Sequence, residues 1–137
     1  LLLLMERIAT ARGGLPFPDL GLLIHGGVAW SPYRDRVRAL LPTGCDTREV
    51  FAASEGFFAV ADAGDGEGMR LILDGGVFFE FVPLAELDAP EPRRLTVTQV
   101  ETGVDYALVV SSCAGLFGYV VGDLVRFASL SPPRVWV

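Results

Sequence analysis

The sequence contains no lysine and no asparagine, only one histidine and only two cysteines. All eleven basic residues are therefore arginines, so no catalytic or Schiff-base lysine can lie in this chain. Cys45 and Cys113 are far apart and form no CxxC motif, which favours a reducing compartment, and we expect a cytoplasmic protein. A zinc site is not expected, because His25 and two distant cysteines make a poor ligand set.

Charge is also scarce. Charged residues make up 20% of the 137 residues, whereas 51% are hydrophobic, and the mean hydropathy is +0.44. For a domain of this size we expect much apolar surface to be buried against residues outside this chain, either the remainder of a parent chain or a covering protein surface. The net charge of −6 argues against a nucleic acid or an anionic membrane as partner.

Long hydrophobic runs without interruption are absent too. The longest uncharged run, residues 106–122, is broken by serines and glycines and has β-branched residues near its ends. A buried hairpin is therefore favoured over a transmembrane helix. The opening leucines lack the positive flank and the cleavage site of a signal peptide.

The first part of the chain has the pattern of a βαβ unit, which favours a parallel or mixed sheet with a right-handed crossover. The strand at Leu20–His25 is almost wholly apolar, as expected of a strand covered on both faces. Ser31 followed by Pro32 predicts a helix start. The predicted elements are a helix over residues 1–11, a strand over 20–25, a helix over 33–41 and a strand over 48–53.

After residue 61 the pattern changes to short strands separated by turn residues, which predicts an antiparallel β-meander or barrel-like subdomain. We therefore divide the chain into an α/β part, residues 1–61, and a meander part, residues 62–137. The acidic loop at Asp62–Gly68 lacks the ligand spacing of a calcium loop. The predicted strands cover residues 69–73, 77–82, 95–100, 106–111, 118–121, 124–128 and 134–137, with a turn at Gly122-Asp123.

The stretch from Val50 to Val60 is the clearest candidate site. An apolar strand stops at small residues, exposes Ser54 and Glu55, and resumes after Gly56. A carboxylate beside a hydroxyl is costly in a core and useful in a cleft. A nucleophile elbow is disfavoured, because a strand rather than a helix follows the serine and the one histidine precedes it.

Three polar motifs follow predicted strands: His25-Gly26-Gly27, Ser54-Glu55-Gly56 and Gly122-Asp123. Each has an ordinary structural interpretation, since paired glycines and Gly-Asp pairs are common in turns and a lone histidine is more often structural. Together they would supply backbone donors, a carboxylate for a metal and a carboxylate for a diol. A nucleotide needs these three features.

Four segments in this order resemble the Gretchen Hagen-type (auxin-responsive) acyl-acid amido synthetases of the adenylate-forming superfamily, particularly bacterial members. The resemblance covers residues 19–137 and depends on the ordered set rather than on one motif. The segments are HGGVAWSPYRDRVRAL, EVFAASEGFFAV, LILDGGVFFEFVP and YALVVSSCAGLFGYVVGDLVRFASL.

The resemblance implies an enzyme that uses ATP and Mg²⁺ to convert a small carboxylic acid into an acyl-adenylate and then passes the acyl group to an amino acid. It implies that Glu55 is the catalytic residue that holds Mg²⁺ near the phosphates, and that Ser54 contacts the α-phosphate. Catalysis would then consist of charge neutralisation and alignment for in-line attack.

The remaining nucleotide contacts are implied in the same way. Gly26 and Gly27 would lie against the adenine and the acyl group, where a side chain would obstruct. Asp123 would accept hydrogen bonds from the ribose hydroxyls, with Tyr119 alongside.

The sequence departs from the family pattern in four places. It lacks the family's Ser/Thr-Gly-rich phosphate loop and its C-terminal domain. Gly118 and Val120 stand where members usually have basic residues, and Phe51 replaces a tyrosine. We therefore expect a central nucleotide-binding segment that is incomplete alone. The alternative is a degenerate, non-catalytic remnant that acts as a partner-binding or structural module.

Overall fold

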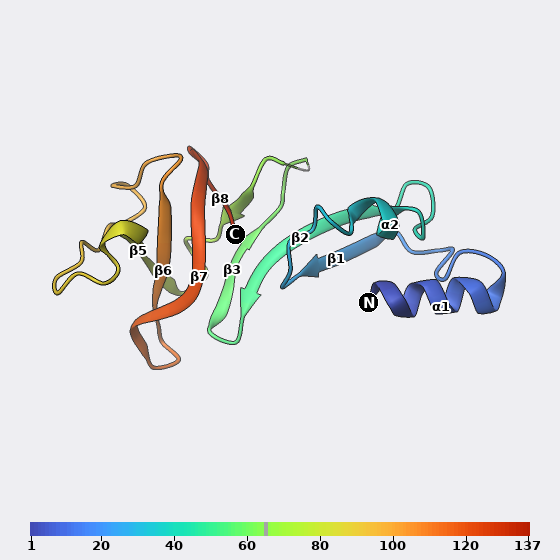
Figure 1. Ribbon diagram of the computed structural model, residues 1–137, viewed down its shortest axis with the longest axis horizontal. Helices are drawn as coiled ribbons and strands as arrows, with labels where there is room; N and C mark the ends of the chain where they lie inside the picture. Colours follow the sequence, from blue (N-terminus) through green and yellow to red (C-terminus); the bar gives the residue numbers. More distant parts are fainter. Residues whose placement is uncertain (65) are drawn as a thin grey trace. The chain divides into compact units, whose positions relative to one another are not determined.

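The computed structural model describes residues 1–64 and 66–137. It forms two compact units, Leu1–Glu49 and Val50–Val137, and one strand, β2, crosses the boundary between them (Figure 1). The strands follow the order β1-β2-β3-β4-β8-β7-β6-β5 in an eight-stranded sheet. The division at residue 61 follows a change in composition and stays a prediction.

The first unit contains two helices and the strands of the predicted βαβ motif. In Figure 1 the arrow of β1 lies beside the first part of β2 and points the same way, and the two strands are neighbours in the sheet. The mixed α/β sheet expected from the sequence is therefore confirmed. The elements are α1 (Leu2–Arg12), β1 (Leu22–Gly26), α2 (Arg34–Arg38) and β2 (Asp46–Ala53).

Helix α1 ends as the sequence predicts. Gly13 adopts the left-handed conformation, with φ of 67°, and its N–H donates to the carbonyl of Ala9. Glycine carries no steric penalty in this conformation and therefore ends helices readily. No helix among the described residues is long and apolar enough to span a membrane.

Strand β1 differs from the expectation that both its faces are covered. Its residues alternate between exposed and half-buried, and Leu22 and Ile24 are 47% and 59% exposed. The small core of the first unit explains the pattern. It is built on Met5, Val37 and Leu41, and it takes Leu23 from β1. In the described chain β1 is therefore buried on one face only.

Helix α2 is shorter than predicted, and Ser31 does not cap it. The N-cap position is Tyr33. The N–H groups of Tyr33 and Arg34 both donate to the carbonyl of Trp30, at 3.0 Å each. Because the backbone satisfies these donors, no serine cap is needed.

The second unit is an antiparallel sheet, which confirms the predicted meander. Among the described residues its paired strands run antiparallel, from β2 with β3 through to β5 with β6. Its further elements are β3 (Gly56–Val60), β4 (Met69–Leu71), β5 (Val77–Pro83), the 3-10 helix η1 (Leu84–Glu86), β6 (Asp105–Ser112), β7 (Leu116–Leu130) and β8 (Pro133–Trp136).

Aromatic side chains fill the core of the second unit. Phe81 of β5 packs edge-to-face against Phe127 of β7, with ring centroids 5.0 Å apart, and against Tyr106 of β6 at 6.2 Å. Phe58 of β3 meets Phe79 of β5 at 6.0 Å. Strands β3 and β5 are not neighbours in the strand order, so this contact shows that the sheet curls until its inner face closes on itself.

One predicted strand, residues 95–100, does not form. Leu95 makes only an isolated bridge with Phe81, and a local turn follows. In that turn the N–H of Thr96 donates to Oε1 of Gln99, and the N–H of Gln99 donates to the carbonyl of Thr96, both at 2.9 Å. These local hydrogen bonds satisfy groups that a strand would have used in a ladder.

The turn predicted at Gly122-Asp123 is also wrong, because β7 runs unbroken from Leu116 to Leu130. Ala107 of β6 pairs with Leu124, and Val109 pairs with Val120. Three residues of β7 thus face the single residue Leu108, and this mismatch is a β-bulge. Gly122, with φ of 98°, permits it.

Asp62 forms a charged cluster with one arginine of β4 and one of β8. Arg134 Nη1 lies 2.5 Å from Asp62 Oδ1 and 3.3 Å from the carbonyl oxygen of Gly68, and Arg70 Nε lies 3.1 Å from Asp62 Oδ2. The hydrogen bond from Arg134, with the charges of both arginines, lowers the pKa of Asp62 below its usual 3.8.

We expect Asp62→Asn to lower the midpoint of thermal unfolding at pH 7 by about 1–4 °C, because the ion pairs are partly exposed. The pKa of Asp62 is lower in the folded state, so its contribution is present above the usual aspartate pKa. It is lost as pH falls through the lowered value. The difference between wild type and variant should therefore shrink toward pH 3. Asp74→Asn, at an exposed position in a turn, is the control and should show no such dependence.

Candidate functional site

Ser54 and Glu55 form the two-residue turn of the hairpin between β2 and β3. Ala53 and Gly56 pair on either side of the turn. Ser54 is exposed and Glu55 half-buried, and Ser54 Oγ donates to Glu55 Oε2 at 2.9 Å. This bond orients the carboxylate and leaves its other oxygen without a partner among the described residues. The hydroxyl and carboxylate thus lie at a strand end, as the sequence predicts, with the hydroxyl residue exposed and the carboxylate residue half-buried.

The donor set at this turn fits Mg²⁺ bound together with a phosphate ligand. No group of three or more histidine, cysteine or acidic side chains capable of holding a metal exists in the part of the chain that the structure describes. Mg²⁺ needs no such group, since it commonly binds one or two carboxylates plus the oxygens of substrate phosphates. Glu55 supplies the carboxylate of this turn.

Gly56, which follows the turn, lies close to β5, the strand at the other end of the strand order. A Cβ on Gly56 would lie 3.0 Å from Phe58 Cε1 and 3.4 Å from Val77 Cγ2. Val77 pairs with Ser112, which pairs with Leu116 at the start of β7. The β2–β3 turn and the β6–β7 hairpin therefore lie at the same end of the unit, the lower edge in Figure 1.

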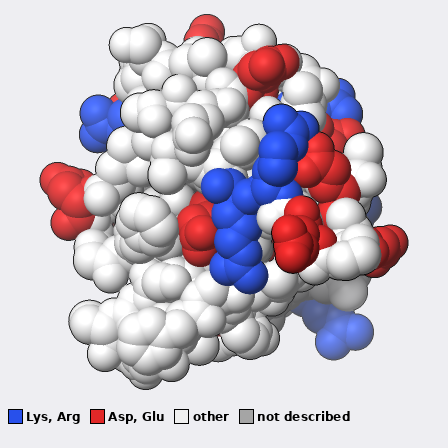
Figure 2. All heavy atoms as spheres, turned by 90° about the vertical axis from the view of Figure 1, so that its left-hand side faces the viewer, with Lys and Arg blue, Asp and Glu red and all other residues white. Residues whose placement is uncertain are grey.

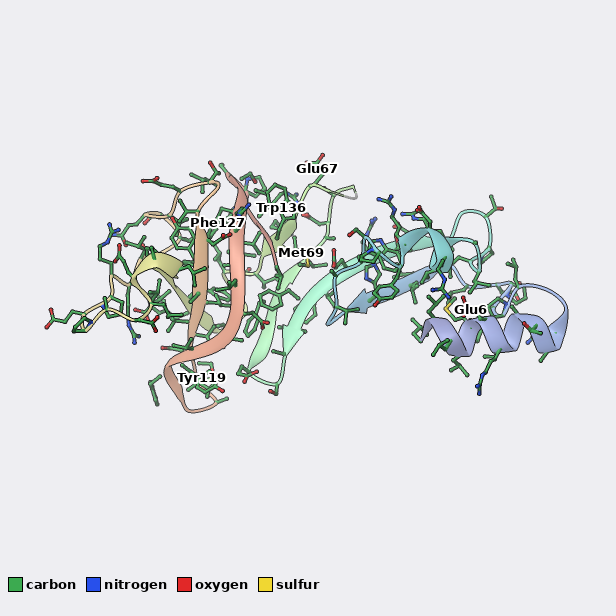
Figure 3. The ribbon with its side chains drawn as sticks, in the orientation of Figure 1. Glu6, Glu67, Met69, Tyr119, Phe127 and Trp136 are labelled. Carbon is green, nitrogen blue, oxygen red and sulfur yellow. The ribbon has the colours of Figure 1, made fainter. Side chains whose placement is uncertain are left out.

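Tyr119 and Asp123 both lie on β7. Tyr119 is 43% exposed and lies toward the hairpin end of the strand, whereas Phe127 lies toward the opposite end (Figure 3). Asp123 is half-buried within the bulge, and bulges commonly redirect side chains beside functional sites. Its carboxylate has no hydrogen-bond or ion-pair partner in the described chain, so it can accept hydrogen bonds from a ligand diol.

Gly26 and Gly27 belong to the first unit, whereas the other four predicted site residues belong to the second. Gly26 ends β1 and lines a cavity of about 260 Å³ together with Trp30, Tyr33 and other residues of that unit. Gly27 has φ of 81°, and nothing lies within 4 Å of the position where its Cβ would be. The backbone conformation therefore requires glycine at this position.

His25 behaves as a structural residue in the first unit. Its ring stacks on Trp30, with centroids 3.7 Å apart and an interplanar angle of 22°. This contact fits the structural interpretation of a lone histidine better than a catalytic one.

Arg94 is a residue near the site that the sequence analysis missed. Its guanidinium lies against Gly118 of β7, where Nη1 is 2.6 Å from the position that a Cβ would take. Gly118 lies on β7, so the structure brings a cation to this strand from another segment. No local sequence pattern connects these two positions.

Comparisons with known proteins agree on one family. Residues 70–136 match the model of the GH3 family central domain. A jasmonoyl–L-amino acid synthetase, JAR4, of Nicotiana attenuata is 46% identical over 50 residues, which are 36% of this chain and 9% of that protein. The indole-3-acetic acid-amido synthetase GH3.2 of Arabidopsis thaliana is 29% identical over 118 residues, 78% of this chain and 21% of that protein.

A comparison of structures agrees with the sequence comparisons. The solved structure of the GH3.15 acyl acid amido synthetase matches with a TM-score of 0.60 and 21% identity, over 77% of this chain and 18% of that one. The chain thus spans about a fifth or less of the relatives it matches. These curated relatives are plant proteins, and the expected nearness to bacterial members stays a prediction. Residues 70–136 thus match the GH3 family central domain, and the chain is similar in sequence and fold to a central segment of these relatives.

Proposed function

We propose that this chain is the central nucleotide-binding segment of an ATP-dependent acyl-acid amido synthetase. In the first step a carboxylate oxygen of the acid attacks the α-phosphorus of ATP, and pyrophosphate leaves. In the second step the amine of an amino acid attacks the carbonyl carbon of the acyl-adenylate, and AMP leaves with the electron pair. The names of the relatives, a jasmonoyl–L-amino acid synthetase and an indole-3-acetic acid-amido synthetase, support this reaction class.

The observation that supports the proposal is that two accessible carboxylates, those of Glu55 and Asp123, both belong to the second unit. Glu55 lies at the β2–β3 turn, at the hairpin end of the sheet, and Asp123 lies in the bulge of β7. We assign Glu55 to Mg²⁺ and Ser54 to the α-phosphate. Bound Mg²⁺ would neutralise phosphate charge as the carboxylate attacks.

The other assignments rest on the family resemblance. Asp123 accepts hydrogen bonds from the ribose hydroxyls, and the exposed ring of Tyr119 lies alongside. In the first unit, Gly26 and Gly27 contact the adenine and the acyl group. Cys45 and Cys113 are both free, which fits the proposed location in the cytoplasm.

Asp123→Asn tests the proposal. We expect the dissociation constant for ATP of the full-length protein to rise about 10- to 100-fold, because charge-assisted hydrogen bonds to two hydroxyls are weakened. Titration calorimetry measures the change. Asp88→Asn, at an exposed position after η1, is the control and should leave the affinity unchanged. Equal affinity in both variants and the wild type would overturn the ribose assignment.

The degenerate remnant stays the second candidate, favoured by Gly118 and Val120 and by exposed apolar side chains such as Phe117, which is 85% exposed. It predicts that the full-length protein neither binds ATP nor catalyses ATP–pyrophosphate exchange with any of a panel of carboxylic acids. Exchange with one acid of the panel would exclude it.

A further inference from the structure

Ser54 holds one carboxylate oxygen of Glu55 and leaves the other available. Ser54 Oγ donates to Glu55 Oε2 at 2.9 Å, and the pairing of Ala53 with Gly56 closes the turn that contains both residues. Glu55 has no other hydrogen-bond or ion-pair partner in the part of the chain that the structure describes. The side chain is therefore oriented by a single contact, and Oε1 remains for a ligand.

The kind of partner distinguishes Glu55 from other carboxylates of the second unit. The carboxylates of Glu80, Glu86 and Asp105 each pair with an arginine. Figure 2 shows such neighbours as blue and red side chains that lie next to one another within a mostly white surface. An arginine beside a carboxylate repels a metal cation. A hydroxyl is neutral, so Ser54 orients Glu55 and leaves its negative charge available to a cation.

The hydroxyl of Ser54 carries a single hydrogen. While that hydrogen is donated to Glu55 Oε2, it cannot also be donated to a phosphate oxygen. The contact of Ser54 with the α-phosphate, which the proposed function assigns, therefore requires the hydrogen to leave Glu55. The arrangement in the structure serves the carboxylate and not the phosphate.

We propose that Ser54 is a positioning residue for the metal, which holds Glu55 Oε2 and leaves Oε1 to Mg²⁺. Carboxylates that bind metals are commonly held by hydrogen bonds of this kind, which fix the orientation of the ligand. The inference rests on the proposed function, which assigns Mg²⁺ to Glu55. It gives Ser54 a role that acts through Glu55 and is separate from any contact with the phosphate.

The test measures ATP binding to the full-length protein by titration calorimetry, without a carboxylic acid, first in EDTA and then in saturating Mg²⁺. The gain in ATP affinity on adding Mg²⁺ reports the metal role of Ser54, whereas the affinity in EDTA reports a phosphate contact. We expect Ser54→Ala to reduce the Mg²⁺-dependent gain about 10-fold, as the loss of a hydrogen bond to a metal ligand typically does.

Three further variants sharpen the test. Ser54→Thr keeps the hydroxyl and should keep the gain. No described residue other than glycine has a positive φ, so alanine and threonine both fit the turn without backbone strain. In a Glu55→Gln background, Ser54→Ala should cause no further loss of the gain, because Ser54 acts through Glu55. Ser129→Ala is the matched control and should keep the gain, since Ser129 Oγ donates to the carbonyl oxygen of Pro132 and not to a carboxylate.

The outcomes separate this inference from the proposed function. If Glu55→Gln reduces the Mg²⁺-dependent gain and Ser54→Ala does not, the positioning role is wrong and the metal assignment stands. If Ser54→Ala weakens ATP binding equally in EDTA and in Mg²⁺, Ser54 contacts only the phosphate and the inference is overturned. A further loss in the Glu55→Gln background would overturn it as well. If the wild-type protein does not bind ATP, the proposed function fails and the inference fails with it.

Discussion

Glu55→Gln is expected to slow Mg²⁺-dependent ATP–pyrophosphate exchange in the full-length protein by about 100- to 1000-fold. Glutamine keeps the size of the side chain and can still accept the hydrogen bond from Ser54 Oγ, which now reaches Glu55 Oε2 at 2.9 Å. The substitution removes the negative charge that we assign to Mg²⁺. Because the change is nearly isosteric on a surface turn, the loss should appear in activity and not in stability.

The control for this experiment is Glu67→Gln. Glu67 is an exposed glutamate of the second unit, and it lies near Met69 and Trp136, away from the hairpin end where Tyr119 lies (Figure 3). The control should keep wild-type exchange at every Mg²⁺ concentration. Wild-type exchange in Glu55→Gln, with the same dependence on Mg²⁺, would show that Glu55 does not hold the metal.

Phe81→Ala is expected to lower the free energy of unfolding by about 3–5 kcal/mol. Phe81 is fully buried on β5, and its ring packs edge-to-face against Phe127 and Tyr106. The truncation leaves a cavity among rings that the sheet holds in place, so the site can collapse only in part. Urea unfolding measures the loss.

Phe78→Ala is the matched control, because Phe78 lies on the same strand but is 57% exposed. We expect a loss of less than about 1 kcal/mol there. Similar losses in the two variants would contradict the assignment of Phe81 to the inner face of the curled sheet.

The strands that could be predicted are those whose own residues carry the signal. A strand is predicted over residues 77–82 from β-branched and aromatic residues, and β5 (Val77–Pro83) is one residue longer. The bulge at Gly122-Asp123 could not be predicted in this way. A Gly-Asp pair fits a turn or a bulge equally well, and the choice depends on pairing with β6, which is a long-range interaction.

The candidate site was also predictable only in part. Ser54 and Glu55 were expected to be exposed because a small-residue break in an apolar strand indicates a turn, and the structure places both in a hairpin turn with Ser54 exposed and Glu55 half-buried. Their proposed roles depend on the family resemblance, which the comparisons support. Arg94 was not predictable, because its relation to Gly118 arises only when the segment before β6 folds over β7.

The contact between Arg94 and Gly118 also has a consequence for the evolution of this family. A mutation of Gly118 to any larger residue collides with the guanidinium, whereas a mutation of Arg94 removes the reason for glycine at position 118 except its positive φ. The two positions therefore constrain each other, and neither can drift alone without loss. Among homologues that carry this hairpin, we expect arginine at position 94 to co-occur with glycine at position 118, and a side chain at position 118 to accompany a different residue at position 94.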